Sequence, residues 1–168
     1  MSKLQEKLAR KIEAWRPRTA KLLKEYGDVK LDEVTIGQAI GGMRDIKCLV
    51  TDISYLDPNE GIRFRGLTIP ETLEKLPKVT GSDMPSVESH FWLLMTGEVP
   101  TKAEVEDLTE DFRKRAAVPQ YVFDVLRAMP RDSHPMAMLS AAMVSMQRES
   151  VFAKRYNFGP DYYTVTYD

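Results

Sequence analysis

Residues 52–69 read D-I-S-Y-L-D-P-N-E-G-I-R-F-R-G-L-T-I, and this stretch decides the fold prediction. Its centre, D-P-N-E-G, is a dense turn signal. Asp57 can accept hydrogen bonds from the backbone ahead of it, Pro58 presets φ for a turn, and Gly61 permits a positive φ. Side chains on either side of the turn alternate with a period of two. Because such alternation around a short glycine-containing turn is typical of a β-hairpin, we predict one small hairpin near residues 49–66.

Outside this stretch, apolar residues recur at steps of three and four, which is the spacing of amphipathic helices. The sequence therefore predicts an all-α protein that carries one hairpin. A further helix is expected to begin at Pro70, and helix follows helix from Pro85 onward. Thr101 and Glu104 have the spacing of a capping box, in which each side chain satisfies a backbone amide at the helix start.

The amino-terminal helix is expected to carry one apolar stripe, formed by Leu4, Leu8, Ile12 and Trp15. Pro17 is expected to interrupt or restart this helix, and Gly27 to follow its end. We expect Trp15 and Leu22 to pack against a larger body of the protein. Lysine and arginine side chains lie mostly off the stripe. They are interpreted as a solvated helix face, which is more common than an anion or membrane site.

Residues 135–146 form the most informative predicted helix, because no charged residue occurs among them. Ser133 is the expected cap, and Pro135 fits the first turn. Methionine and leucine side chains line one face. Small residues spaced by four line another face: Ala137, Ala141 and Ser145. A helix that is apolar nearly all round must be covered on more than one side. Spacing alone fits a monomer core and a subunit interface equally well.

Composition limits the class of protein. With 168 residues, 43% apolar and 29% charged, the chain has the length and balance of one globular domain, spanning residues 1–168. A formal net charge of −1 gives no reason to expect nucleic acid or an anionic membrane as a partner. Cys48 is the only cysteine, which favours a reducing compartment. The basic amino terminus contains Glu6 and Glu13, which mitochondrial transit peptides avoid, so a cytoplasmic localisation is expected.

Four blocks of the sequence carry a family resemblance. They are G-G-M-R at 41–44, L-D-P-N-E-G-I-R-F-R-G at 56–66, F-W-L-L-M-T-G at 91–97, and H-P-M with L-S-A-A at 134–142. In this order they resemble the amino-terminal part of citrate synthases of the eukaryotic-like, dimeric type. The resemblance implies a portion of the family's large helical domain. It also implies a homodimer, because the helix corresponding to Pro135–Met146 packs antiparallel across the subunit two-fold axis in that family.

The resemblance implies an acyltransferase of the tricarboxylic acid cycle. Citrate synthases condense acetyl-CoA with oxaloacetate, with coenzyme A as a substrate rather than a tightly bound cofactor, and they require no metal. The chemistry needs an aspartate base and two histidines that act on the enolate and carbonyl oxygens. This sequence contains only His90 and His134, and neither matches the family's catalytic segments. No catalytic residue is therefore assigned, and the isolated chain is expected to be inactive. The alternative is a non-catalytic helical module for dimerisation or assembly.

One site residue follows from the resemblance. Arg44 matches the family arginine that contacts the phosphates of coenzyme A. The preceding pair, Gly41 and Gly42, is expected to let exposed backbone and the guanidinium approach a phosphate together. Without the resemblance, a plain surface arginine is the more common interpretation.

Two other arginines, Arg63 and Arg65, flank the hairpin. They could bind carboxylates, but a buried structural pair with Asp52, Asp57 or Glu60 is the favoured interpretation. Near the carboxyl end, residues 162–167 favour a strand by propensity alone, whereas the resemblance implies a helix there.

Overall fold

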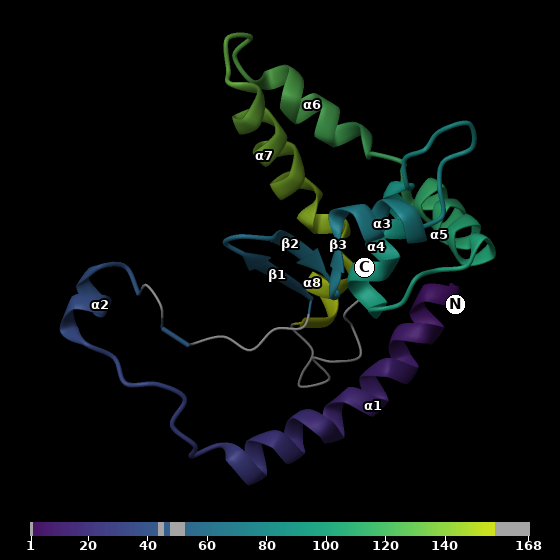
Figure 1. The fold of residues 1–168 in the computed structure, drawn as a ribbon. Coiled ribbons are helices and arrows are strands. Elements are labelled where there is room, and N and C mark those ends of the chain that lie inside the picture. Colours follow the sequence, from purple (N-terminus) through teal and green to yellow (C-terminus); the bar gives the residue numbers. More distant parts are fainter. Residues whose placement is uncertain (1, 44–45, 48–52, 157–168) are drawn as a thin grey trace. The chain divides into compact units, whose positions relative to one another are not determined.

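The computed structural model describes residues 2–43, 46–47 and 53–156 (Figure 1). The chain divides into two compact units, Met1–Asp111 and Phe112–Asp168, and each is described by itself. The first unit contains the whole sheet, and the prediction of a mostly helical protein with a small β element is confirmed. In chain order the elements are α1 Lys3–Tyr26, α2 Ile36–Ile40, β1 Ser54–Asp57, β2 Gly61–Phe64, β3 Leu67–Thr68, α3 Ile69–Lys75, α4 Val87–Thr96, α5 Lys102–Arg115, α6 Gln120–Ala128, α7 Pro135–Ser145, η1 Met146–Glu149 and α8 Val151–Tyr156.

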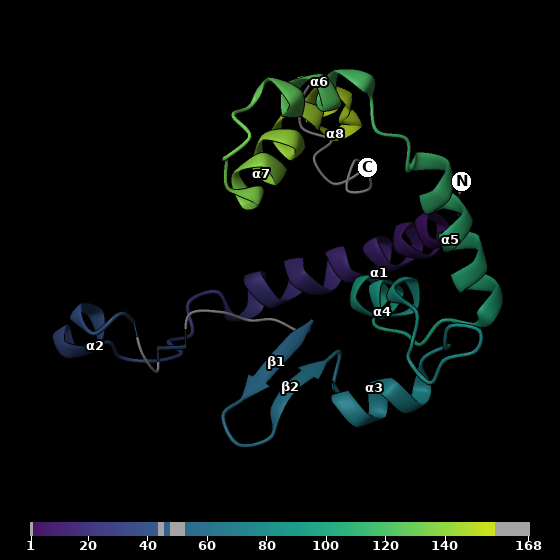
Figure 2. The same ribbon diagram turned by 90° about the horizontal axis from the view of Figure 1, so that it is seen from above.

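The predicted hairpin is confirmed. Strands β1 and β2 pair antiparallel, with Asp57 opposite Gly61, and they lie side by side in Figure 2. The Asp57 carboxylate accepts hydrogen bonds from the backbone amides of Glu60 (2.9 Å) and Asn59 (2.8 Å), and these bonds lower the pKa of Asp57. Gly61 has φ 88°, the left-handed conformation that the turn required. Residues 49–52 of the predicted hairpin lie outside the described residues.

A third strand extends the sheet beyond the prediction. β3 pairs antiparallel with β2 through a two-residue turn, Arg65–Gly66. Both turn residues have positive φ, 50° and 85°, as a type I′ turn requires. This strand is hard to predict from the sequence, because an arginine at the first turn position is unusual and the strand is only two residues long.

Helix α1 confirms part of the amino-terminal prediction. Leu4 and Leu8 are buried against the rest of the first unit, and the helix ends at Gly27. Two expectations are wrong. Pro17 lies inside one continuous helix, and Leu22 is exposed. Pro17 and the preceding turn lie on an exposed part of the helix, so water can satisfy the carbonyl that proline leaves without an amide partner.

The core of the first unit centres on α4, against which α1 packs. Val87, Phe91 and Leu94 have the spacing of one apolar stripe, but they are not the buried face of this helix: Val87 is exposed and the other two are half-buried. Trp92 and Leu93 form the buried face instead. The other large apolar side chains of this core come from α1, from the residue that follows α3, and from α5: Leu4, Leu8, Leu76 and Leu108.

The helix starts follow the predicted capping chemistry. Thr68 caps α3 just before Pro70, and the Thr101–Glu104 box is present at the start of α5. Gly97 ends α4 with φ 72°. These ends are well predicted because a cap is a contact between residues three apart in the chain.

In the second unit, α6 packs against α7 and α7 continues into η1. The cap of α7 is His134 rather than the predicted Ser133: its Nδ1 accepts a hydrogen bond from the Met136 amide at 3.2 Å. The helix ends at Ser145. The strand predicted for residues 162–167 lies outside the described residues.

Candidate functional site

The segment that leads to Arg44 is a short helix fixed at both ends. Helix α2 begins at a capping box: the Thr35 hydroxyl accepts from the Gln38 amide (3.2 Å), and the Gln38 side chain accepts from the Thr35 amide (3.0 Å). At the other end, the Met43 amide donates to the Gln38 carbonyl at 2.9 Å. A bond between residues five apart after a helix end is the mark of a Schellman motif, with Gly42 at its left-handed position.

Of the glycine pair, Gly42 adopts a left-handed conformation, whereas Gly41 has an ordinary negative φ of −74°. Gly42 has φ 86°, and a Cβ added there would meet nothing within 4 Å, so the requirement for glycine is conformational rather than one of space. Met43 follows with φ 63°, also in the left-handed region. A residue other than glycine pays about 1–2 kcal/mol for that conformation. The described segment that precedes Arg44 therefore closes with two consecutive left-handed residues, Gly42 and Met43.

The expected role of the exposed backbone needs correction. The Gly41 amide donates to the Gly37 carbonyl at 2.9 Å, and the Met43 amide is taken by Gln38. Two amides that could have faced a phosphate are thus occupied by the end of α2. Recognition of an anion here would depend on the guanidinium of Arg44, which itself lies outside the described residues.

Arg63 forms the expected pair with Glu60, but on the surface. Its Nη2 lies 2.5 Å from the Glu60 carboxylate, and this contact raises the pKa of Arg63. The same side chain donates to the Gly66 carbonyl at 3.2 Å. The expectation of a buried pair is wrong, because the hairpin loop that contains Glu60 is exposed to solvent. The Arg63–Glu60 pair is a local surface contact that stabilises the turn.

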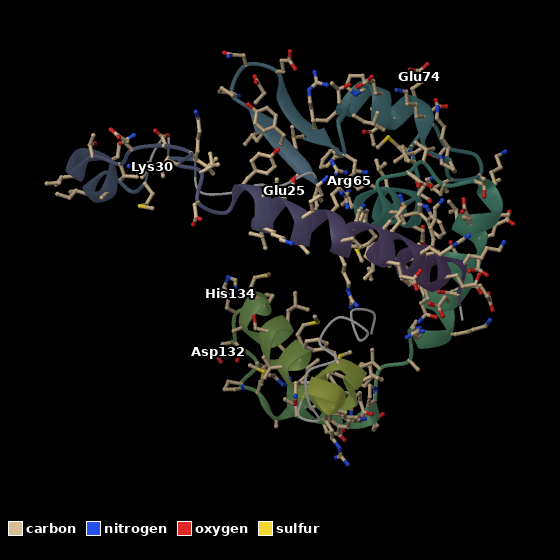
Figure 3. All side chains as sticks on the ribbon, turned by 90° about the horizontal axis from the view of Figure 1, so that it is seen from below. Glu25, Lys30, Arg65, Glu74, Asp132 and His134 are labelled. Carbon is tan, nitrogen blue, oxygen red and sulfur yellow. The ribbon has the colours of Figure 1, made fainter. Side chains whose placement is uncertain are left out.

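Arg65 connects three elements of the first unit (Figure 3). Its Nε donates to the Leu94 carbonyl of α4 at 2.9 Å, and its Cζ lies 5.9 Å from the centre of the Trp15 ring of α1. A cation at the carboxyl end of a helix is favoured by the helix dipole. The side chain thus joins the sheet to α1 and α4, which fits a structural role.

The contacts that His90 and His134 make are structural rather than those of a proton-transfer group. His90 is half-buried, and its ring lies edge-on to Phe64 with the centroids 4.6 Å apart. The Nδ1 of His134 caps the start of α7 (Figure 3). Among residues 2–43, 46–47 and 53–156, no group of three or more His, Cys, Asp or Glu side chains could hold a metal ion.

A largely apolar depression of about 460 Å³ lies between the sheet, α3 and α4. Phe64 and Ile69 line one side, and Phe91 and Leu94 line the other. Its lining includes His90 and the hydroxyl residues Thr72 and Ser86, but no Asp, Glu, Lys or Arg. This surface can accept apolar groups, but it offers no charged group to orient a polar substrate.

A charged cluster fastens α1 to the segment between α4 and α5. Lys7 and Lys11 lie 2.6 and 2.5 Å from the Glu98 carboxylate, and Lys7 also approaches Glu104 at 3.4 Å. Hydrogen bonds from Lys11 and Lys7 lower the pKa of Glu98. The interpretation of Lys7 and Lys11 as part of a solvated face is therefore wrong, because both are paired with acidic residues. The sequence could not show this, since Glu98 and Glu104 lie some ninety positions away in the chain.

The described residues define a mostly α-helical protein with a small antiparallel sheet. Within that part of the chain, no helix combines the length and apolarity needed to cross a bilayer. A family model described as "Citrate synthase, C-terminal domain" matches residues 42–164.

Similar full-length proteins support the same family. "Citrate synthase, mitochondrial" of Saccharomyces cerevisiae is 46% identical over 98% of this chain and 35% of its own length. "Probable citrate synthase, mitochondrial" of Glossina morsitans morsitans is 46% identical over 94% of this chain and 34% of its own. "2-methylcitrate synthase, mitochondrial" of Yarrowia lipolytica is 44% identical over 98% and 36%. The chain belongs to the citrate synthase family, and it spans about a third of the length of these relatives.

The expected cytoplasmic localisation is contradicted, because these relatives are named as mitochondrial proteins. The prediction took Glu6 and Glu13 as evidence against a mitochondrial transit peptide at the amino terminus. Leu4 is fully buried and Lys7 is ion-paired, so this segment is part of the folded unit and its acidic residues carry no information on targeting. The assignment to the amino-terminal portion of the family stays a prediction.

Proposed function

We propose that this chain is the amino-terminal part of a longer citrate synthase, in which it supplies helical scaffold, a dimer-interface helix and one contact to coenzyme A. The observation that carries the proposal is the 46% identity that extends over 98% of the chain. The activity proposed for the longer enzyme is condensation of acetyl-CoA with oxaloacetate to give citrate and coenzyme A. No metal or tightly bound cofactor is invoked.

Arg44 is the residue to which we assign the phosphate contact. The occupied amides of Gly41 and Met43 support a role for the side chain rather than for the backbone. Arginine suits a phosphate because its planar fork donates two parallel charge-assisted hydrogen bonds, each stronger than a neutral one.

The test is Arg44→Ala in the longer enzyme, assayed by release of the coenzyme A thiol. Loss of a charge-assisted contact should raise the KM for acetyl-CoA roughly tenfold or more while the KM for oxaloacetate stays unchanged. Arg44→Lys should give an intermediate value, because a point charge replaces the fork. Arg131→Ala, at another exposed arginine, is the matched control. An unchanged KM for acetyl-CoA in Arg44→Ala would refute the assignment.

For the 168-residue chain alone we propose no condensing activity. Both histidines have structural positions: His90 packs on Phe64 and His134 caps α7. The thiol-release assay on the pure chain, with acetyl-CoA or propionyl-CoA and oxaloacetate, should show no turnover above a blank. Propionyl-CoA is included because one relative is named a 2-methylcitrate synthase. Appreciable turnover would contradict this proposal.

The proposed dimer contact is α7. None of its residues is buried, although all eleven are uncharged, and the large side chains Met136, Leu139, Met143 and Val144 are exposed. An exposed apolar face of this kind is typical of an interaction surface. The citrate synthase proposal and the non-catalytic alternative both predict association through α7. Association alone therefore does not distinguish them, and the activity assay of the longer protein is needed as well.

A further inference from the structure

The apolar depression between the sheet, α3 and α4 is lined by large side chains that the first unit leaves uncovered. Val87 is 79% exposed, Met84 is 59% exposed and Ile69 is 52% exposed. The buried apolar core of the described part of this unit is small by comparison: Leu4, Leu8, Leu76, Trp92, Leu93 and Leu108. Exposed apolar side chains that gather around one hollow, rather than lying scattered, mark a surface that another surface covers.

The hydroxyl groups of the depression already bond to neighbouring backbone. The Ser86 hydroxyl accepts from the Ser89 amide at 3.1 Å, where it caps α4, and the Thr72 hydroxyl donates to the Thr68 carbonyl at 2.8 Å. The lining contains no Asp, Glu, Lys or Arg. Anionic substrates such as oxaloacetate and acetyl-CoA would therefore find no charged partner here. Apolar side chains of a polypeptide could enter without leaving a polar group unpaired.

The length of the relatives indicates where such a polypeptide segment comes from. The Saccharomyces cerevisiae relative is 46% identical over 98% of this chain, but the match covers only 35% of its own length. About two-thirds of that protein therefore has no counterpart in the 168 residues. Because a longer chain buries a larger fraction of its surface on folding, apolar surface that one third leaves open is expected to be covered by the rest.

We propose that the apolar depression is the docking site for an apolar segment from the part of the longer polypeptide that lies beyond this chain. This assignment requires the longer protein, so it rests on the proposed function. It differs from the role of α7, which is assigned to a second copy. The uncharged lining decides the chemistry of the segment: the side chains that contact the depression are apolar and carry no charge, because a charge buried there would have no partner.

The experiment compares the accessibility of position 87 in the 168-residue chain and in the longer protein. Val87→Cys is introduced into both, the thiol is labelled with a maleimide, and peptide mass spectrometry reads the label at that position alone. The chain should be labelled as fast as an exposed thiol, because Val87 is 79% exposed. The longer protein should be labelled at position 87 at least roughly tenfold more slowly, because labelling then requires the docked segment to open.

Glu74→Cys is the matched control. Glu74 is an exposed residue of α3 that does not line the depression, so a thiol there should be labelled at similar rates in the two proteins. Equal labelling rates at position 87 in the chain and in the longer protein would overturn the inference. Equal protection at positions 74 and 87 would also overturn it, since the protection would then not be specific to the depression.

Val87→Glu provides a second measurement that does not depend on labelling. A carboxylate in a covered apolar site is costly, so this substitution should lower the melting temperature of the longer protein by several degrees. It should not lower that of the 168-residue chain, where position 87 is exposed and an acid suits the first turn of α4. An unchanged melting temperature of the longer protein would contradict the docking site.

Concentration separates this proposal from occupation by a second copy of the chain. If a second copy filled the depression, protection of position 87 would appear in the 168-residue chain as its concentration rises, and that result would overturn the inference. The mass of the native protein separates the two possible failures. A native product of 168 residues would refute the proposed function together with the docking site. A longer protein that condenses acetyl-CoA with oxaloacetate, yet is labelled at position 87 as fast as the chain, would refute the docking site alone.

Discussion

Helices α4 and α7 have similar lengths but differ in how much of their surface is buried. α4 contains Glu88 and His90, yet it buries Trp92 and Leu93 almost completely. α7 contains no charged residue and buries none of its side chains. The more apolar helix is therefore the more exposed one. Burial depends on which surfaces a chain can bring to a helix. Within the described residues, α1 packs against α4, whereas α7 packs mainly against α6 and runs into η1.

The comparison indicates two different uses of an apolar helix. α4 is a core element whose partners lie in the same unit, so its packing contributes to the stability of this chain. The surface of α7 remains available, so its contribution should appear only when a second surface covers it.

The largest expected effect is at Trp92. Trp92→Ala removes the largest fully buried side chain, and it should lower the free energy of unfolding of the chain by about 3–5 kcal/mol, measured by urea denaturation. Leu139→Ala on α7 should cost less than about 1 kcal/mol in the same chain, because Leu139 is 53% exposed. Comparable losses at the two positions would remove the distinction between the helices.

Trp92→Phe is the matched control for that experiment. The indole Nε1 is buried and has no hydrogen-bond partner among the described residues. Phenylalanine keeps most of the ring and removes an unsatisfied donor, so it should cost clearly less than alanine.

The second effect concerns self-association. Leu139→Glu places a charge on the exposed apolar face of α7, so it should shift the 168-residue chain toward monomer in sedimentation velocity and dissociate the longer enzyme. Thr19→Glu adds the same charge at an exposed position of α1 and should leave association unchanged. A chain that sediments as a monomer at all concentrations without substitution would count against α7 as an interface.

The smallest effect is at the charged cluster that holds α1 to the α4 core. Glu98 is about half-exposed, so Glu98→Gln should cost no more than about 1 kcal/mol at pH 7, and less in high salt. Because the folded pKa of Glu98 lies below its ordinary value of 4.5, its contribution is complete above that pH and is lost as the pH falls through the lower value.

The measurement for this prediction is urea denaturation of the unmodified chain and of Glu98→Gln between pH 7 and pH 3. The difference between the two curves should shrink as Glu98 becomes protonated. Glu74→Gln, at an exposed glutamate of α3 (Figure 3), should show no such convergence. A difference that grows on acidification would contradict the assigned ion pairs.

Local features of the fold were predictable from the sequence, and the candidate site only in part. The hairpin turn at Asp57–Gly61, the cap at Thr68 and the helix end at Gly97 all depend on residues within five positions of one another. A glycine at position 42 permits the positive φ of 86° that the structure has there. The occupation of the Gly41 and Met43 amides was missed, although the capping-box spacing of Thr35 and Gln38 could have indicated a helix ending there.

The sequence by itself determined the helical class, the turn chemistry and, through four short blocks in a fixed order, the family resemblance. Tertiary structure alone decided which face of α4 is buried, that Lys7 and Lys11 meet Glu98, and that α7 is left uncovered. The physical reason is the range of the interactions. Caps and turns are satisfied within a few residues, whereas burial and ion pairing depend on segments that folding brings together from distant parts of the chain.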